Sequence, residues 1–221
     1  MSVLERISFS NIVHDYINTF YNYGAKRNTA KSKPLLEDYI LFLFTPVIIS
    51  ILLVLIGVRI DVSFFDLLIS SLSIFTGLLF SLLTLVYDIG KKEKAELDKI
   101  CQELDLYQDE NFNFSKVSLL KSRKVKNEDK VVYVKEIFTQ ISFAIITSII
   151  SICLIFLTQL NAPDLENFTL NILSQEMIEM VKCLFLKIVT VLSYFLLIEF
   201  VLSLLLILRR FYSLYKLEFR E

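Results

Sequence analysis

Residues 64–87 read FFDLLISSLSIFTGLLFSLLTLVY, and Asp66 is the one charged residue within this run. A helix that crosses the hydrocarbon layer of a bilayer needs about 20 consecutive, mostly apolar residues. Because that layer holds no water, a spanning segment must satisfy its backbone hydrogen bonds internally, and a continuous apolar run does so as an α-helix. The run at 64–87 therefore predicts a transmembrane helix.

Three further runs, at 39–58, 137–157 and 183–208, have the same apolar character. Hydrophobic residues make up 55% of the 221 residues, with only four glycines and three prolines, and the mean hydropathy is +0.60. This composition is too apolar for an ordinary soluble domain. We predict an all-α polytopic membrane protein, with four transmembrane helices in two antiparallel hairpins and a small helical cytoplasmic region.

The predicted spans divide the chain into five parts. These are a cytoplasmic amphipathic arm and linker at 1–38, a first transmembrane hairpin at 39–87, a charged cytoplasmic loop at 88–133, a second hairpin at 134–208 with an outer loop at 158–180, and a cytoplasmic tail at 209–221. Charge and apolar periodicity predict that the second span continues into the charged loop as an amphipathic helix over 91–107.

Lys and Arg residues are distributed unevenly about the predicted spans. Ten lie within 88–133 and none within 158–180, while others cluster before the first span and after the fourth. Positive residues flanking a span stay on the cytoplasmic side during insertion. We therefore expect a multi-pass membrane protein, with both termini in the cytoplasm and the lipid bilayer as its first partner.

Small and polar residues recur along the second span with spacings of four and three. They are Asp66, Ser70, Ser73, Gly77, Ser81, Thr84 and Asp88. Such positions drift by only about 40° around a helix of 3.6 residues per turn, so they form one stripe. Small residues let membrane helices approach closely, which favours a packing face; a polar lining for a pore is the alternative. A weaker stripe on the third span, at Gln140, Ala144, Thr147, Ser151 and Thr158, predicts that spans two and three pack together.

The fourth predicted span contains two charged residues, Lys187 and Glu199. Lys187 lies near the outer end, where its long stem can reach water. Glu199 lies deeper, and ionisable groups within a span are costly and commonly functional. We interpret Glu199 as an intramembrane acid, either with a gating, proton-linked or assembly role or simply held by an interhelical hydrogen bond, and Lys135 is the expected neighbouring cation.

Aromatic side chains are abundant in the small cytoplasmic region. An aromatic face on the arm, which includes Phe9, Tyr16 and Phe20, predicts a helix that packs on the chain itself or on a partner. Exposed aromatic clusters commonly form protein contacts. We therefore predict a cytosolic protein partner that docks on Phe9, Tyr16, Phe20, Phe112, Phe114, Phe211 and Tyr212.

Residues that could support catalysis or cofactor binding are scarce. His14 is the only histidine, the three cysteines have no metal-like spacing, and the four glycines are isolated. These patterns match neither a nucleophile–base pair nor a phosphate-binding loop. The basic run at 121–126 is explained by the charge rule for membrane insertion. We predict no enzyme activity, no cofactor, no metal and no direct nucleic-acid contact.

The order of a two-span hairpin, a charged cytoplasmic insertion and two more spans, together with SLSIFTGLLFS at 71–81, resembles small four-span proteins of bacterial antiphage defence. Among these, the chain resembles in architecture the membrane subunits of the Kiwa system, the KwaA family, and this resemblance implies a location in the bacterial inner membrane. This resemblance implies a tetramer-like membrane assembly, a soluble DNA-binding partner and a role in sensing phage infection at the envelope.

Two functions are consistent with these features. The first is an oligomeric membrane-embedded sensor or scaffold subunit of an antiphage defence complex, which docks a cytosolic effector. The alternative is a pore-forming or ion-channel effector that permeabilises the inner membrane through the stripe on span two.

Overall fold

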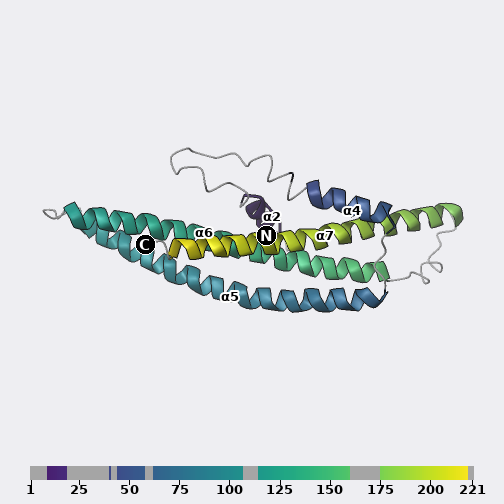
Figure 1. Ribbon diagram of the computed structural model, residues 1–221, viewed down its shortest axis with the longest axis horizontal. Coiled ribbons are helices and arrows are strands. Elements are labelled where there is room, and N and C mark those ends of the chain that lie inside the picture. Colours follow the sequence, from purple (N-terminus) through teal and green to yellow (C-terminus); the bar gives the residue numbers. More distant parts are fainter. Residues whose placement is uncertain are drawn as a thin grey trace, which may run out of the picture. The chain divides into compact units, whose positions relative to one another are not determined.

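The computed structural model describes residues 9–18, 40, 44–57, 62–106, 114–159 and 175–218. Nearly all of them are helical, and these ranges contain no strand. The helices, labelled as in Figure 1, are α2 (Phe9–Asn18), α4 (Thr45–Leu55), α5 (Val62–Leu106), α6 (Phe114–Gln159) and α7 (Gln175–Glu218). The all-α prediction is therefore confirmed for the described part of the chain.

Three of these helices are long and apolar enough to cross a membrane, over Phe65–Leu106, Lys116–Leu157 and Cys183–Lys216. Within the first predicted span, at 39–58, the structure shows α4, which has 11 residues. At a rise of about 1.5 Å per residue, a helix of this length covers roughly half of the hydrocarbon layer. The membrane character of the chain is thus supported, whereas a count of four spans is not confirmed.

The ends of α4 have clear local causes. Pro46 lies in its first turn, where a missing N–H breaks no helical hydrogen bond. At the other end Gly57 adopts a φ of 80°, which a glycine reaches without steric cost, and its N–H donates to Val54 O at 3.1 Å. A left-handed residue of this kind commonly terminates a helix.

The long helices extend well beyond their apolar runs. α5 continues without a break through the charged residues that follow Asp88, as far as Leu106. In the same way α6 starts at Phe114, and its apolar run starts only at Ile137. Much of the predicted charged loop is therefore helical, and the predicted continuation of span two is present.

The chain folds as two compact units. The first comprises Met1–Thr19, Leu78–Phe143 and Ser203–Glu221, and the second comprises Phe20–Gly77 and Ala144–Leu202. Each unit has a buried core of its own. In the first unit the core includes Val86, Ile100, Leu104, Leu120, Val134, Ile137, Ile141, Leu206 and Ile207; in the second it includes Leu72, Ala144, Ile145, Ile155, Val189 and Phe200.

Candidate functional site

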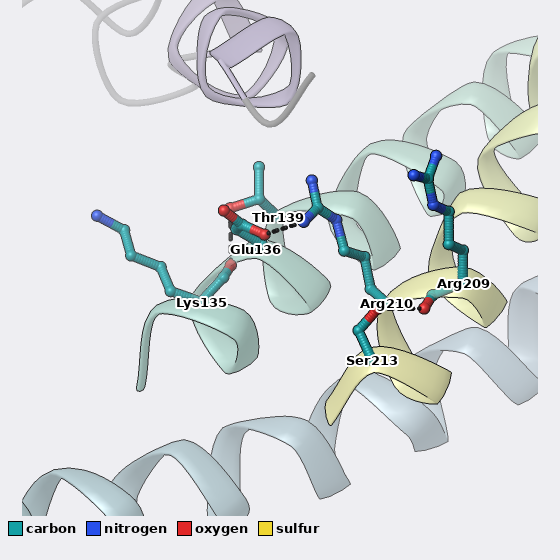
Figure 2. Close-up of polar contacts among 6 residues, drawn as sticks. All are labelled: Lys135, Glu136, Thr139, Arg209, Arg210 and Ser213. Atoms are coloured by element: carbon teal, nitrogen blue, oxygen red, sulfur yellow. Dashed lines mark hydrogen bonds and ion pairs between the residues drawn. The ribbon is translucent and has the colours of Figure 1, made fainter. Parts of the chain in front are cut away.

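A buried ion pair joins α6 and α7 in the first unit (Figure 2). Arg210 Nη1 lies 2.9 Å from Glu136 Oε2, and the two side chains are only 15% and 8% exposed. Glu136 immediately precedes the apolar run of α6, and Arg210 follows closely after the apolar run of α7. The pair therefore connects the two helices at the point where each becomes charged.

The neighbouring charges are arranged differently. Lys135 and Arg209 are exposed, and Figure 2 shows their side chains directed away from the ion pair. The backbone around them is regular, with Thr139 Oγ1 donating to Lys135 O at 3.0 Å and Ser213 Oγ donating to Arg209 O at 3.1 Å. Of the two adjacent arginines, Arg210 is thus the one whose charge is taken into the interior of the unit.

A second ion pair lies further along the charged extension of α6. Lys130 Nζ is 3.7 Å from Glu93 Oε1 of α5, and both side chains are largely buried. Asn127 is also buried one turn earlier. Close by, a Cβ added to Gly90 would lie 3.1 Å from Val134 Cγ1, so α5 and α6 approach tightly at this glycine. The extended part of the hairpin is therefore a packed structure with specific polar contacts.

α2 is attached to the first unit through Tyr16. The Tyr16 ring stacks on Phe143 with a centroid separation of 3.7 Å and an interplanar angle of 10°. Its hydroxyl shares a hydrogen bond of 3.2 Å with Ser203 Oγ of α7. Tyr16 is only 3% exposed. Of the two predicted alternatives for the aromatic face of the arm, Tyr16 therefore shows packing on the chain itself, against α6 and α7. Its assignment to the docking of a partner is corrected.

The structure describes the side chains of only some of the other predicted docking residues. Tyr212 is 67% exposed, and Phe211 beside it is half-buried. Phe9 and Phe114 lie in α2 and α6, but their side chains are outside the description, and Phe20 and Phe112 fall outside the described residues. Tyr212 is therefore the predicted docking residue that this structure shows to be accessible.

The stripe predicted on span two lies on the exposed side of α5. Its members are Asp66, Ser70, Ser73, Gly77, Ser81, Thr84 and Asp88, and all are exposed in the single chain. A Cβ added to Gly77 would meet nothing within 4 Å. In the described part of the chain the stripe is therefore accessible, and Gly77 does not mark a close helix contact there.

A neighbouring face of α5 makes that contact instead. In the second unit the hydroxyls of Thr76 and Ser148 share a hydrogen bond of 2.5 Å, and Thr76 Oγ1 also donates to Leu72 O at 2.6 Å. Ser148 Oγ also lies within hydrogen-bonding distance of Leu72 O, at 3.4 Å, so either hydroxyl can be the donor in the Thr76–Ser148 pair. Spans two and three do pack together, as predicted, but through Thr76, which the sequence analysis did not select.

The weaker stripe on α6 faces inward. Gln140, Ala144, Thr147 and Ser151 are all buried, and Ser151 Oγ donates to Thr147 O at 2.7 Å. Back-donation to the carbonyl one turn earlier lets a hydroxyl enter an apolar helix contact. The remaining member, Thr158, is a helical residue whose side chain is outside the description.

Glu199 is buried within the second unit, with 5% of its surface exposed. The next residue, Phe200, meets Phe75 of α5 edge to face, with ring centroids 6.2 Å apart. This placement agrees with an acid directed inward from its span. Lys187, by contrast, is exposed on α7.

Glu136 was not among the predicted site residues. Lys135 was the expected cation for Glu199, whereas the ion pair that the structure shows at the end of the apolar run joins Glu136 to Arg210. One signal was present in the sequence: an acid and a base occupy matching positions, just outside the apolar runs of α6 and α7.

The described ranges contain no group of three or more His, Cys, Asp or Glu residues that could hold a metal ion. His14 is exposed, with Nδ1 3.9 Å from Asp15 Oδ1. Comparisons with family models, curated proteins and solved structures yield no match for this chain.

Proposed function

We propose that this protein is an oligomeric, membrane-embedded sensor or scaffold subunit of a bacterial antiphage defence complex, which docks a cytosolic effector partner. The antiphage role rests on the resemblance to four-span defence proteins and on the stretch at 71–81. DNA binding is assigned to the partner, and the membrane subunit itself contacts lipid and protein.

The exposed polar stripe of α5 is the observation that carries the oligomer. Asp66, Ser70, Ser73 and Gly77 lie on an exposed side of a helix that is apolar enough to span a membrane. Polar and ionisable residues within a span commonly face protein or water rather than lipid. A second copy of the chain supplies that environment, with the small residues allowing close approach.

The charged extensions of α5 and α6 support partner docking. Beyond their apolar runs the two helices continue as a packed hairpin, held by Ile100, Leu104 and Leu120. Together with exposed Tyr212 on α7, this surface offers a cytosolic protein both charged and aromatic contacts.

We further propose four spans, with both termini in the cytoplasm. The apolar run at 39–58 is long enough to cross, and an even number of crossings places the positive flanks of every span on one side. A reporter fused after Glu221 is expected to be active only in the cytoplasm. Activity only in the periplasm would overturn this topology.

Native mass spectrometry of the detergent-extracted complex tests the assembly directly. The expected result is a homo-oligomer, with a tetramer as the proposed number, carrying a stoichiometric soluble partner. Gly77→Leu is expected to reduce the oligomer because it blocks close approach on the stripe, whereas Leu78→Ile, a change at the adjacent exposed position, is the matched control. Recovery of only a monomer without a partner contradicts the proposal.

A pore is the second candidate function, and the same exposed face favours it. Ser70, Ser73 and Ser81 would line a water-filled path if several copies faced one another. Ion flux into liposomes separates the candidates: a pore predicts flux that Ser73→Leu and Ser81→Leu abolish and that Ile74→Leu, beside the stripe, preserves. Absence of flux under every trigger eliminates the pore.

A further inference from the structure

The charged hairpin formed by the ends of α5 and α6 has one acidic and one basic helix. Over 96–106, α5 carries four acidic residues and one lysine, while α6 carries five cations and no acid over 116–126. The two helices pack against each other in the first unit through Ile100, Leu104 and Leu120, with Val117 beside them. The two packed helices of the hairpin therefore carry opposite charges.

The charged side chains of interest lie on the exposed surface of this hairpin. They are Glu96, Asp98, Glu103 and Asp105 on α5, and Lys116, Lys121, Arg123 and Lys126 on α6. Within the described ranges, the ion pairs of the first unit include Lys130 with Glu93 and Arg210 with Glu136, and none of them joins two of these eight groups. Their charge is available to something outside the chain.

We propose that the acidic face of α5 in one copy of the chain docks on the basic face of α6 in the next copy. The inference rests on the oligomer proposed above and adds a contact at the hairpin ends. Each copy carries both complementary surfaces, one on each helix, so the contact is heterologous and closes into a ring when the rotation permits. The four acids of α5 favour a second copy over a polyanion, which the acidic helix would repel.

The contact between hairpins is expected to be weak by itself. Exposed ion pairs are individually weak and are screened by salt. Copies already joined through their spans have a high effective concentration, so weak pairs add to an assembly that exists for another reason. The hairpin contact therefore sets the register and orientation of neighbouring copies, which is the usual contribution of complementary charge at an interface.

Charge reversal in trans tests the proposal with the full-length chain in membranes. One variant combines Lys121→Glu with Arg123→Glu, and the other combines Glu96→Lys with Glu103→Lys. Neighbouring carboxylates and lysine amines are joined with a zero-length carbodiimide cross-linker, and cross-linked dimers of differently tagged copies are counted. Each variant expressed alone is expected to lose most of the dimer, by about fivefold or more, because like charges then face each other.

Co-expression of the two variants is the decisive arm. A contact between copies predicts that mixed dimers return to within about twofold of the wild-type yield, because each reversed face meets a complementary face. Loss in either variant without recovery in the mixture overturns the proposal and assigns the surface to lipid, to a partner or to the hairpin's own fold. Unchanged cross-linking in both variants also overturns it. Native mass spectrometry of the same samples tests the hairpin contact and the proposed oligomer separately. An intact oligomer without the hairpin contact contradicts only the contact, whereas a wild-type monomer contradicts both the contact and the oligomer.

Discussion

The two units of the molecule satisfy their buried polar groups in different ways. In the first unit an ion pair joins Glu136 to Arg210, and a hydroxyl contact joins Tyr16 to Ser203. In the second unit the contact shown between helices is between two hydroxyls, those of Thr76 and Ser148. Between apolar helices in a membrane, small residues and hydroxyls supply packing and hydrogen bonds. Where the helices become charged, ion pairs give a defined register at the cost of desolvation.

Removing the buried acid of the first unit is expected to have the largest effect. Glu136→Ala leaves the Arg210 guanidinium inside the unit without its acid, and breaking a buried pair in this way costs about 3–5 kcal/mol. The free energy of unfolding, measured by denaturant titration in mild detergent, checks this value. Lys135→Ala, at the exposed neighbouring position, is the control and should change stability by less than about 0.5 kcal/mol. Equal effects of the two substitutions would show that the pair does not hold α6 to α7.

The anchor of α2 offers a second comparison within the first unit. Tyr16→Phe keeps the ring on Phe143 and removes the hydroxyl that meets Ser203, so α2 should loosen by about 0.5–1.5 kcal/mol. Hydrogen exchange of the α2 amides measures this local opening. Ile17→Val, on the exposed side of the same helix, is the matched control. If exchange in the Tyr16→Phe variant equals that of the control, the Tyr16 hydroxyl contributes nothing to docking of α2.

Loss of a single hydroxyl contact in the second unit should lower the free energy of unfolding by less. Thr76→Val keeps the shape of the side chain and removes the hydrogen bond with Ser148, and such bonds within membrane proteins average about 0.6 kcal/mol. Denaturant titration in detergent, with Ser73→Val on the exposed stripe as control, measures the difference. A loss as large as that of Glu136→Ala would remove the distinction between the two units.

The sequence predicted most of the helical architecture because length and apolar runs are local properties. It predicted that α5 would continue past Asp88, and that Glu199 would lie within a span. It did not show which face of α5 packs inward, because the face that contains Thr76 follows the same helical spacing as the stripe that contains Ser73 and Gly77. Periodicity shows which residues share a face, whereas the neighbour of that face depends on packing between distant segments.

The missed ion pair has the same cause. Glu136 and Arg210 are far apart in sequence, and nothing local distinguishes Glu136 from Lys135 or Arg210 from Arg209 as the inward-facing residue. The choice follows from the rotation of α6 and α7 about their axes, which the whole helix contact sets. For the same reason Tyr16, on the aromatic face of the arm, was wrongly assigned to the docking of a partner, although it is buried in the chain.

The smallest expected effect on stability is at Tyr212, the exposed aromatic residue of the predicted docking set. Tyr212→Ala should change the free energy of unfolding by less than about 0.5 kcal/mol, because the side chain is 67% exposed. Its effect on partner binding should be larger, with affinity falling about tenfold or more if the residue is an interface hot spot. Quantitative co-purification of the soluble partner measures this loss, and Tyr212→Phe, which keeps the ring, should retain most of the binding. A variant that binds normally would place the partner elsewhere on the first unit, whereas a variant that unfolds would show that Tyr212 belongs to the core, like Tyr16.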